Sequence, residues 1–173
     1  MKKPVRICMI GAGRVGKNHS RALGYVPEAK IVALVDPMKE VREETASEFG
    51  IENQFDSLDA ALEKVEFDGV VITTPTPTHL PLTQLAAEHK KHVFLEKPMA
   101  LNLQECDAII QCVEKNGVLL QLGFMRRFER VDDNLQGLLP VMMREAGFSE
   151  VEVTGSTSTI VGSLSYLIGH KPL

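Results

Sequence analysis

Three glycines near the start of the chain constrain its fold more than any other feature. The apolar run Val5–Ile10 leads into them, and the residues that follow can form a helix. The glycine stretch consists of Gly11, Ala12, Gly13, Arg14, Val15 and Gly16. The first glycine permits a tight turn, the second lets a diphosphate approach the main chain, and the third lets strand and helix pack closely. We therefore expect a phosphate to bind at the helix N-terminus, where N–H groups are free and the helix dipole favours an anion.

A carboxylate follows the second apolar run at a spacing typical of dinucleotide-binding proteins. Asp36 comes twenty residues after Gly16 and directly after the run Lys30–Val35. A carboxylate at this place accepts hydrogen bonds from an adenosine ribose. Together these features predict a dinucleotide site; the alternative is a glycine turn that only packs. Asp36 repels the 2′-phosphate of NADP, which favours NAD, but Lys39 and Arg42 are close enough to leave NADP open.

Strand-like and helix-like segments alternate through the first three quarters of the chain. The expected strands are Val5–Ile10, Lys30–Val35, Gln54–Phe55, Gly69–Thr73, His92–Leu95 and Val118–Leu122. The expected helices are Arg14–Leu23, Lys39–Phe49, Ala60–Lys64, a helix capped by Thr78 that runs through Glu88, and Leu103–Lys115. Nearly continuous apolar strands separated by helices indicate a parallel sheet covered on both faces. The pattern predicts a Rossmann-like, doubly wound α/β fold with three layers.

The rhythm changes after about residue 128. A helix is expected over Asp132–Ala146, followed by strands over Glu150–Thr157 and Thr159–Gly169 with a turn at Ser156–Ser158. Two strands joined so closely pair antiparallel, because a parallel return needs a crossover of roughly a dozen residues. We expect residues 1–128 to form the dinucleotide-binding domain and residues 129–173 to complete it with a helix and a hairpin, leaving no separate substrate domain.

A loop rich in threonine and proline follows the fourth expected strand, at the sheet edge where open α/β folds bind ligands. Thr73, Thr74, Pro75 and His79 belong to this loop. The prolines stiffen it, and the threonine hydroxyls can hydrogen-bond a ribose. For His79, hydrogen bonds to nearby main chain are the favoured interpretation.

The sequence Glu96-Lys97-Pro98 follows the fifth expected strand at the same edge. A partly desolvated Lys97 near a positively charged nicotinamide would have a lowered pKa and could exchange a proton with a substrate hydroxyl or carbonyl. The alternative is a surface pairing of Lys97 with Glu96, which would contribute little. Spacing alone leaves both interpretations open.

In combination, these motifs resemble the Gfo/Idh/MocA oxidoreductases, of the glucose-fructose oxidoreductase and inositol dehydrogenase type. The resemblance covers residues 5–128 and rests on GAGRVG, Asp36, TPTPTH, HVFLEKPMAL and QLGFMRRF. It implies hydride transfer between a nicotinamide and a hydroxyl-bearing carbon, often on a sugar or cyclitol. It also implies NAD(P) binding by Gly11, Gly13, Gly16 and Asp36, a nicotinamide-side loop with Thr74, Pro75 and His79, and a catalytic or substrate-positioning role for Lys97.

The tail departs from the family pattern. In that family GFMRRF leads into a large second domain, whereas 45 residues follow Phe128 here. Residues 132–172 resemble the terminal helix and hairpin of class I methyltransferases that use S-adenosylmethionine. A non-catalytic dinucleotide-binding module and a natural fusion or engineered chimera therefore stay open. A methyltransferase is disfavoured, because Ile10 stands where such sites usually place an acid.

Composition narrows the class of partner. Nineteen basic and 23 acidic residues give a net charge of −4, and no basic run reaches five residues, which argues against a nucleic-acid partner. No window reaches the roughly 18 apolar residues that a membrane span needs. Three cysteines without metal-ligand spacing suit reduced thiols in the cytoplasm, so we expect packing roles and no metal site. The identity of the substrate and the oligomeric state stay open.

Overall fold

The computed structural model describes residues 3–123, 149–159 and 162–170. The chain divides into two units, Met1–Gly123 and Phe124–Leu173. Among the described residues, no helix combines the length and apolar character needed to cross a membrane.

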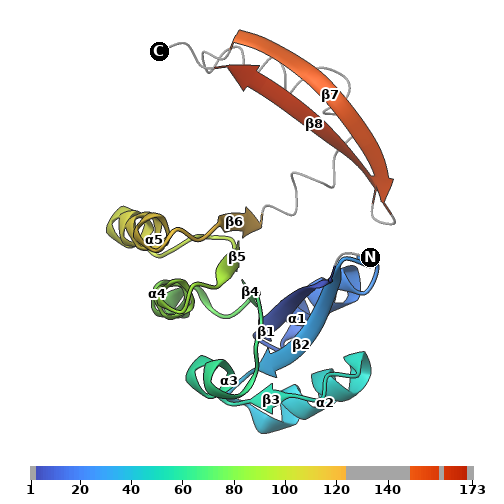
Figure 1. Cartoon of the computed structure of the whole chain (residues 1–173), viewed down its shortest axis with the longest axis vertical. Helices are drawn as coiled ribbons and strands as arrows, with labels where there is room; N and C mark the ends of the chain where they lie inside the picture. Colours follow the sequence, from blue (N-terminus) through green and yellow to red (C-terminus); the bar gives the residue numbers. More distant parts are fainter. Residues whose placement is uncertain (1–2, 124–148, 160–161, 171–173) are drawn as a thin grey trace. The chain divides into compact units, whose positions relative to one another are not determined.

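The first unit is built on a parallel sheet of six strands (Figure 1). The strands are β1 (Val5–Ile10), β2 (Ala29–Val35), β3 (Gln54–Phe55), β4 (Gly69–Ile72), β5 (His92–Glu96) and β6 (Leu120–Gly123). Their order is β3-β2-β1-β4-β5-β6, and every neighbouring pair is parallel. This order reverses direction between β1 and β4, as in dinucleotide-binding folds. The predicted doubly wound parallel sheet is confirmed.

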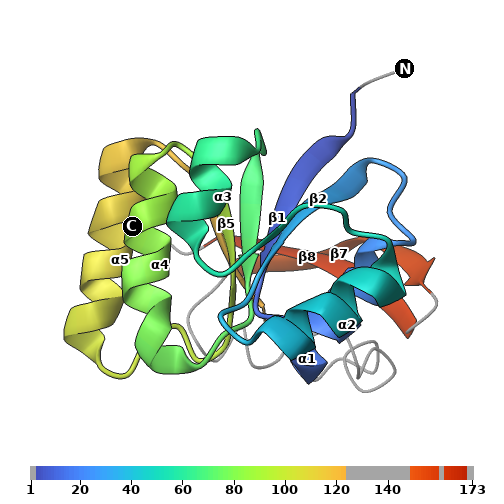
Figure 2. The same ribbon diagram turned by 90° about the horizontal axis from the view of Figure 1, so that it is seen from below.

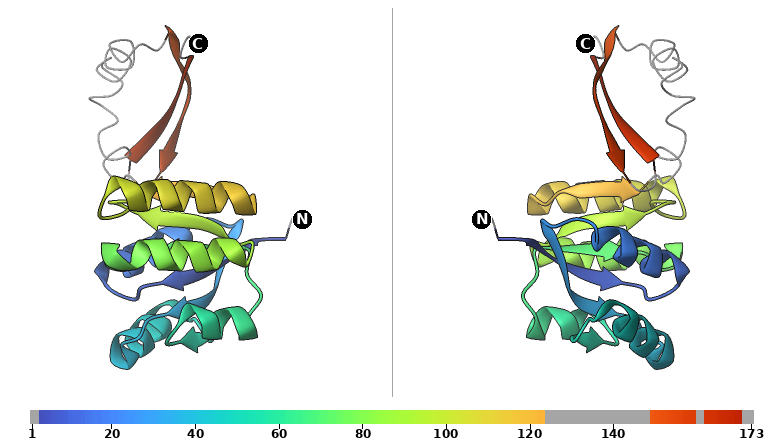
Figure 3. Two further views of the ribbon diagram at one scale, coloured as in Figure 1. Left: turned by 90° about the vertical axis from the view of Figure 1, so that its left-hand side faces the viewer. Right: turned by 90° about the vertical axis from the view of Figure 1, so that its right-hand side faces the viewer.

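Helices cover both faces of this sheet. They are α1 (Arg14–Leu23), α2 (Lys39–Phe49), α3 (Leu58–Lys64), α4 (His79–Glu88, preceded by the 3-10 turn Thr76–Thr78) and α5 (Leu103–Asn116). One face is covered by α1 and α2, and the other by α3, α4 and α5 (Figures 2 and 3). The unit therefore has the three layers that the alternating pattern predicts.

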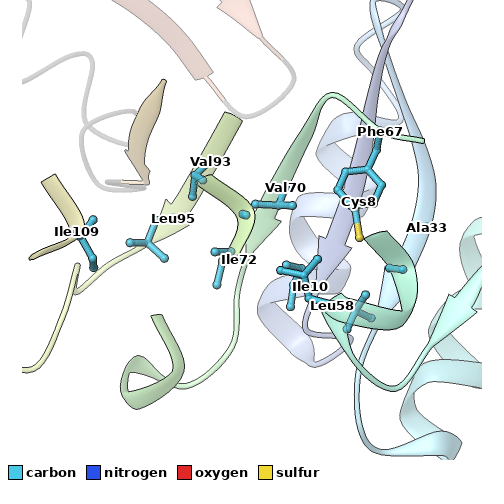
Figure 4. Close-up of a cluster of buried hydrophobic side chains, with 13 residues drawn as sticks. Cys8, Ile10, Ala33, Leu58, Phe67, Val70, Ile72, Val93, Leu95 and Ile109 are labelled. Carbon is cyan, nitrogen blue, oxygen red and sulfur yellow. The ribbon is translucent and has the colours of Figure 1, made fainter. Parts of the chain in front are cut away.

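Alternation along β1 divides the apolar core between the two faces. Cys8 and Ile10 pack toward α3, α4 and α5 (Figure 4), while Ile7 and Met9 pack toward α1 and α2. Successive strand side chains point to opposite faces, so a strand covered on both sides is apolar at every position. Burial raises the pKa of the Cys8 thiol to about 12, which keeps it protonated and inert.

Most helix ends lie where the sequence predicts them. The helices α2 and α5 are followed by Gly50 and Gly117, and the Ser57 side chain accepts a hydrogen bond from the main-chain N–H of Ala60. The predicted cap by Thr78 is wrong in its hydrogen bonding. Thr78 precedes α4, but its hydroxyl donates to the Pro75 carbonyl oxygen, because the 3-10 turn places that acceptor next to it.

In the second unit, the structure describes the strands β7 (Ser149–Thr159) and β8 (Gly162–His170), which pair antiparallel as a sheet of two. The predicted turn at Ser156–Ser158 is wrong, because these residues pair with residues 163–165. The helix predicted over Asp132–Ala146 lies outside the described residues. The prediction that residues 129–173 complete the first domain stays a prediction.

Candidate functional site

The register of the sheet brings the predicted site segments to one edge. Ile10 pairs with Val35 on one side and with Ile72 on the other, and Ile72 pairs with Leu95. The residues that directly follow these four positions are Gly11, Asp36, Thr73 and Glu96. The glycine stretch, the carboxylate, the threonine loop and the lysine segment therefore leave the sheet side by side, at the carboxyl ends of parallel strands.

Two of the three glycines are required by contacts within the protein. Gly11 has a φ of +101°, and a Cβ there would lie 2.7 Å from the Thr73 hydroxyl oxygen. A Cβ on Gly16 would lie 1.9 Å from the carbonyl oxygen of Gly11. Neither position accommodates a side chain, so both are explained by the turn and by the packing of α1 against it.

Gly13 differs from the other two glycines. Its φ of −72° is open to any residue, and a Cβ built there meets no described atom within 4 Å. Packing within the described part of the chain thus gives no reason for a glycine. The space that a side chain would fill lies beside the N-terminus of α1, where a ligand diphosphate can approach the main chain.

The polar groups of the glycine stretch are arranged to receive an anion. Carbonyl oxygens at the start of the stretch and just before it contact side chains of the protein. The Thr73 hydroxyl lies 3.0 Å from the carbonyl oxygen of Ile10 and 3.1 Å from that of Gly11. Buried Thr45 donates to the carbonyl oxygen of Ala12 at 2.9 Å. The main-chain N–H groups of residues 13–15 have no hydrogen-bond partner among the described residues. Unpaired donors at the positive end of α1 fit a diphosphate.

Asp36 lies directly beside this stretch. Its carboxylate accepts hydrogen bonds from the N–H groups of Ala12 at 2.8 Å and Met38 at 2.9 Å. Arg42 donates to the carbonyl oxygen of Asp36, and the Lys39 ammonium lies 3.8 Å from Glu43. Both cations that leave NADP open in the sequence thus have a partner within the protein, and the Asp36 carboxylate is fixed by two main-chain donors; its contact with a ribose stays a prediction.

A pocket of about 410 Å³ adjoins the glycine stretch and is lined by residues of α1 and by Val41 of α2. Its lining includes Gly13, Arg14 and Lys17. The Lys17 ammonium lies 2.6 Å from Glu44 and 3.3 Å from Glu48, and the hydrogen bond to Glu44 raises the pKa of Lys17. Lys17 is thus paired with carboxylates of the protein. Arg14, exposed at the first helical position, is the cation nearest in sequence to the unpaired amides.

The threonine loop is closed by hydrogen bonds of its own. The hydroxyl oxygens of Thr74 and Thr78 lie 2.7 Å apart. His79 is buried, with Nε2 3.0 Å from the Thr74 carbonyl oxygen and Nδ1 2.9 Å from that of Pro98. The ring thus joins the loop to the lysine segment through main-chain contacts, as the favoured interpretation expects. Cofactor contacts of Thr73, Thr74, Pro75 and His79 stay predictions.

Lys97 is exposed, and its ammonium group has no hydrogen bond or ion pair among the described residues. Glu96 is 6% exposed; one carboxylate oxygen lies 2.9 Å from His19 Nε2, and the other accepts the Lys97 main-chain N–H at 2.9 Å. The alternative surface pairing of Lys97 with Glu96 is therefore wrong, because Glu96 is buried and, among the described residues, its side chain pairs with His19 and not with the Lys97 ammonium. The partial desolvation expected for Lys97 is not supplied by the described residues.

The sequence patterns do not identify two polar residues near this edge. Thr45 and His19 lie within expected helices, and each makes the polar contact described above. A signal was available in both cases: a polar side chain on the inner face of an amphipathic helix needs a hydrogen-bond partner. The sequence does not reveal which partner, since that depends on how the helices lie on the sheet.

A parallel sheet of this order, with an open glycine stretch and an aspartate after its second strand, defines a dinucleotide-binding Rossmann domain. Residues 5–124 match the sequence model of the GFO_IDH_MocA oxidoreductase family, described as an NAD-binding Rossmann fold. The chain belongs to this family, and its first unit is an NAD-binding domain.

Similar proteins include several inositol dehydrogenases. The chain is 42% identical over 130 residues to scyllo-inositol 2-dehydrogenase (NAD(+)) of Bacillus subtilis, an alignment covering 75% of this chain and 38% of the relative. It is 28% identical over 180 residues to inositol 2-dehydrogenase/D-chiro-inositol 3-dehydrogenase of Halalkalibacterium halodurans, covering 94% and 51%. Scyllo-inositol dehydrogenase of Lactobacillus casei, with bound NAD(H) and scyllo-inositol, superposes with a TM-score of 0.72 at 27% identity, covering 86% and 43%. The chain thus spans about half or less of each of these relatives.

Proposed function

We propose that this chain supplies the cofactor-binding part of an NAD-dependent oxidoreductase that acts on a hydroxyl-bearing carbon of a cyclitol or sugar. The observation that carries the proposal is the row formed by Gly11, Asp36, Thr73 and Glu96 along one sheet edge. The amides proposed to bind phosphate follow β1, between Asp36 after β2 and the threonine loop after β4, and the lysine segment follows β5 beyond that loop. The names of the inositol dehydrogenases above support the substrate class.

Different residues along this row bind different parts of the dinucleotide. The N–H groups of residues 13–15 hold the diphosphate, and Asp36 accepts hydrogen bonds from the adenosine ribose. The threonine loop lies toward the nicotinamide side. The same cofactor-binding surface also includes main-chain groups of Ala12, Arg14, Val15 and Glu96. NAD, when bound, supplies the chemistry of hydride transfer.

In this proposal Lys97 accepts the substrate's hydroxyl proton during oxidation and donates it in the reverse reaction. Oxidation of an alcohol releases a proton from the hydroxyl group as a hydride leaves the carbon, and the reverse reaction needs that proton back. Lys97 extends from the end of β5 without a partner among residues 3–123, so its amine is available to a substrate hydroxyl. A positioned acid or base of this kind contributes roughly 10²- to 10⁴-fold to the rate.

Two measurements test the proposal. NADH fluorescence is titrated with the chain, and saturable binding below millimolar cofactor is expected. NAD reduction is then followed with scyllo-inositol, myo-inositol and related polyols, comparing the unaltered chain with Lys97→Ala. We expect Lys97→Ala to lower turnover at least a hundredfold and to change the Kd for NADH by less than about threefold. No NADH binding by the unaltered chain contradicts the proposal.

A second candidate is a dinucleotide-binding module without catalysis, which includes the fusion or chimera expected from the tail. The alignment with the Halalkalibacterium halodurans relative extends well past residue 124, which favours a tail of the same family over a methyltransferase end. NADH binding without turnover of any polyol tested would favour the module. Stabilisation by S-adenosylmethionine but not by NADH would favour a methyltransferase.

A further inference from the structure

Helix α1 contacts the lysine segment through one partly buried pair of side chains. His19 lies on the second turn of α1, and its Nε2 is 2.9 Å from a carboxylate oxygen of Glu96 at the end of β5. The two side chains are 19% and 7% exposed. The imidazole also packs edge-on against Phe94, with ring centroids 5.3 Å apart at 65°. The ring is thus held on two sides, by a hydrogen bond and by an aromatic contact.

The second carboxylate oxygen of Glu96 extends this contact to the lysine. It accepts the main-chain N–H of Lys97 at 2.9 Å. A buried carboxylate is costly unless it is hydrogen-bonded, and here each oxygen has a donor. One side chain therefore connects the helix that carries the phosphate-binding amides to the main chain of Lys97.

The neighbouring strand leaves room for this pair. A Cβ on Gly123 would lie 2.9 Å from the Phe94 ring and 3.5 Å from a carboxylate oxygen of Glu96. A side chain on Gly123 would force the Phe94 ring, which contacts His19, to move. The glycine in β6 is therefore explained by the same cluster.

We propose that His19 and Glu96 are positioning residues that set the place of Lys97 relative to the cofactor-binding end of α1. His19 orients the Glu96 carboxylate, and the carboxylate orients the Lys97 main chain. The effect on catalysis rests on the proposed function of Lys97, whereas the positioning itself belongs to the folded chain with or without cofactor. Because the Glu96 carboxylate faces His19, the cofactor contact proposed above for Glu96 is limited to its main chain.

The first test determines the tautomer of the His19 ring in the unaltered chain. Nitrogen-15 NMR of the imidazole distinguishes which ring nitrogen carries hydrogen. We expect hydrogen on Nε2, since that atom must donate to Glu96. A neutral ring with its hydrogen on Nδ1 overturns the proposal, and this measurement requires no variant and no cofactor.

The second test measures hydrogen exchange of the Lys97 amide in variants of the full chain. In His19→Phe, which keeps an aromatic ring against Phe94, we expect hydrogen exchange of the Lys97 amide to be at least tenfold faster than in the unaltered chain. The Val93 amide, in the core of β5, should change by less than about twofold. His19→Gln keeps an N–H donor and should restore protection to within about threefold. His89→Gln, on the exposed end of α4, serves as the matched control and should leave Lys97 unchanged.

Unchanged Lys97 exchange in His19→Phe overturns the proposal, and so does an equal rise at Val93, which indicates general loosening. If His19→Phe does not fold, the ring measurement above decides. Where turnover is measurable, His19→Phe should lower kcat at least tenfold while the Kd for NADH stays within about threefold, and His19→Gln should recover most of kcat. An unchanged kcat overturns the catalytic part. Failure of the proposed function can be distinguished from failure of this inference. It would be seen as absent NADH binding or absent turnover in the unaltered chain.

Discussion

Replacing Gly13 with valine separates binding from folding in this domain. No described atom lies within 4 Å of a Cβ at this position, and its φ of −72° suits valine. Glycine is a better N-cap than valine by about 1 kcal/mol, partly offset by the more restricted unfolded chain. The free energy of unfolding should therefore fall by about 1 kcal/mol or less, measured by urea denaturation.

The same change should remove most cofactor binding. The valine side chain occupies the space through which a diphosphate reaches the amides of residues 13–15. Hydrogen bonds to a charged group contribute roughly 1.5–3 kcal/mol each, so losing two corresponds to at least about 3 kcal/mol, or more than a hundredfold in Kd. NADH fluorescence titration measures this loss.

Gly16→Ala is the matched comparison. Its Cβ would lie 1.9 Å from the Gly11 carbonyl oxygen, where real Cβ atoms stay beyond 3.0 Å, so the main chain must move by at least 1.1 Å (3.0 minus 1.9). We expect a loss of about 3 kcal/mol or more in stability. The reasoning is refuted if Gly13→Val binds NADH within threefold of the unaltered chain, or if it destabilises the fold as much as Gly16→Ala.

Three further changes test other parts of the account. Asp36→Ser should weaken NADH about tenfold or more and narrow the gap to NADPH in parallel titrations; an unchanged preference contradicts the assignment of Asp36. Thr45→Val leaves the Ala12 carbonyl oxygen buried without its donor, so urea denaturation should show a loss of about 1–3 kcal/mol, and no loss contradicts its role. The hydrogen bond from Arg6 lowers the pKa of Asp68 to about 2 from 3.8, so this pair stabilises the fold above about pH 4 and its contribution is lost as the pH falls toward 2. Because Asp68 is 41% exposed, solvent screening limits the effect to about 1 kcal/mol, and Asp68→Asn should flatten the stability profile between pH 4 and 2; an unchanged profile contradicts it.

The sequence predicts the elements of the first unit well because their signals are local. The helix over Arg14–Leu23 and the short strand Gln54–Phe55 have the predicted bounds. Apolar runs, glycine stops and the spacing from the glycine stretch to Asp36 each involve residues near one another in the chain. Even the row along the sheet edge follows, since parallel strands in this order bring their carboxyl ends together.

Contacts between distant residues could not be predicted in the same way. His19 and Glu96 are 77 residues apart, and Thr45 and Ala12 are 33 apart. Which side chains meet depends on the rotation of each helix over the sheet and on strand register, and no short pattern encodes these. The predicted Thr78 cap differs in its hydrogen bond for a related reason, because the 3-10 turn places the Pro75 carbonyl oxygen next to the Thr78 hydroxyl.

The central claim is that a dinucleotide lies across the row from Gly13 to Lys97, and mapping amide NMR shifts during NADH titration tests it most directly. We expect the largest saturable changes at the amides of residues 13–15, with further changes after Asp36, in the threonine loop and at Lys97. Shifts confined to the outer surface of α5, or no saturable shifts at millimolar NADH, would contradict the claim.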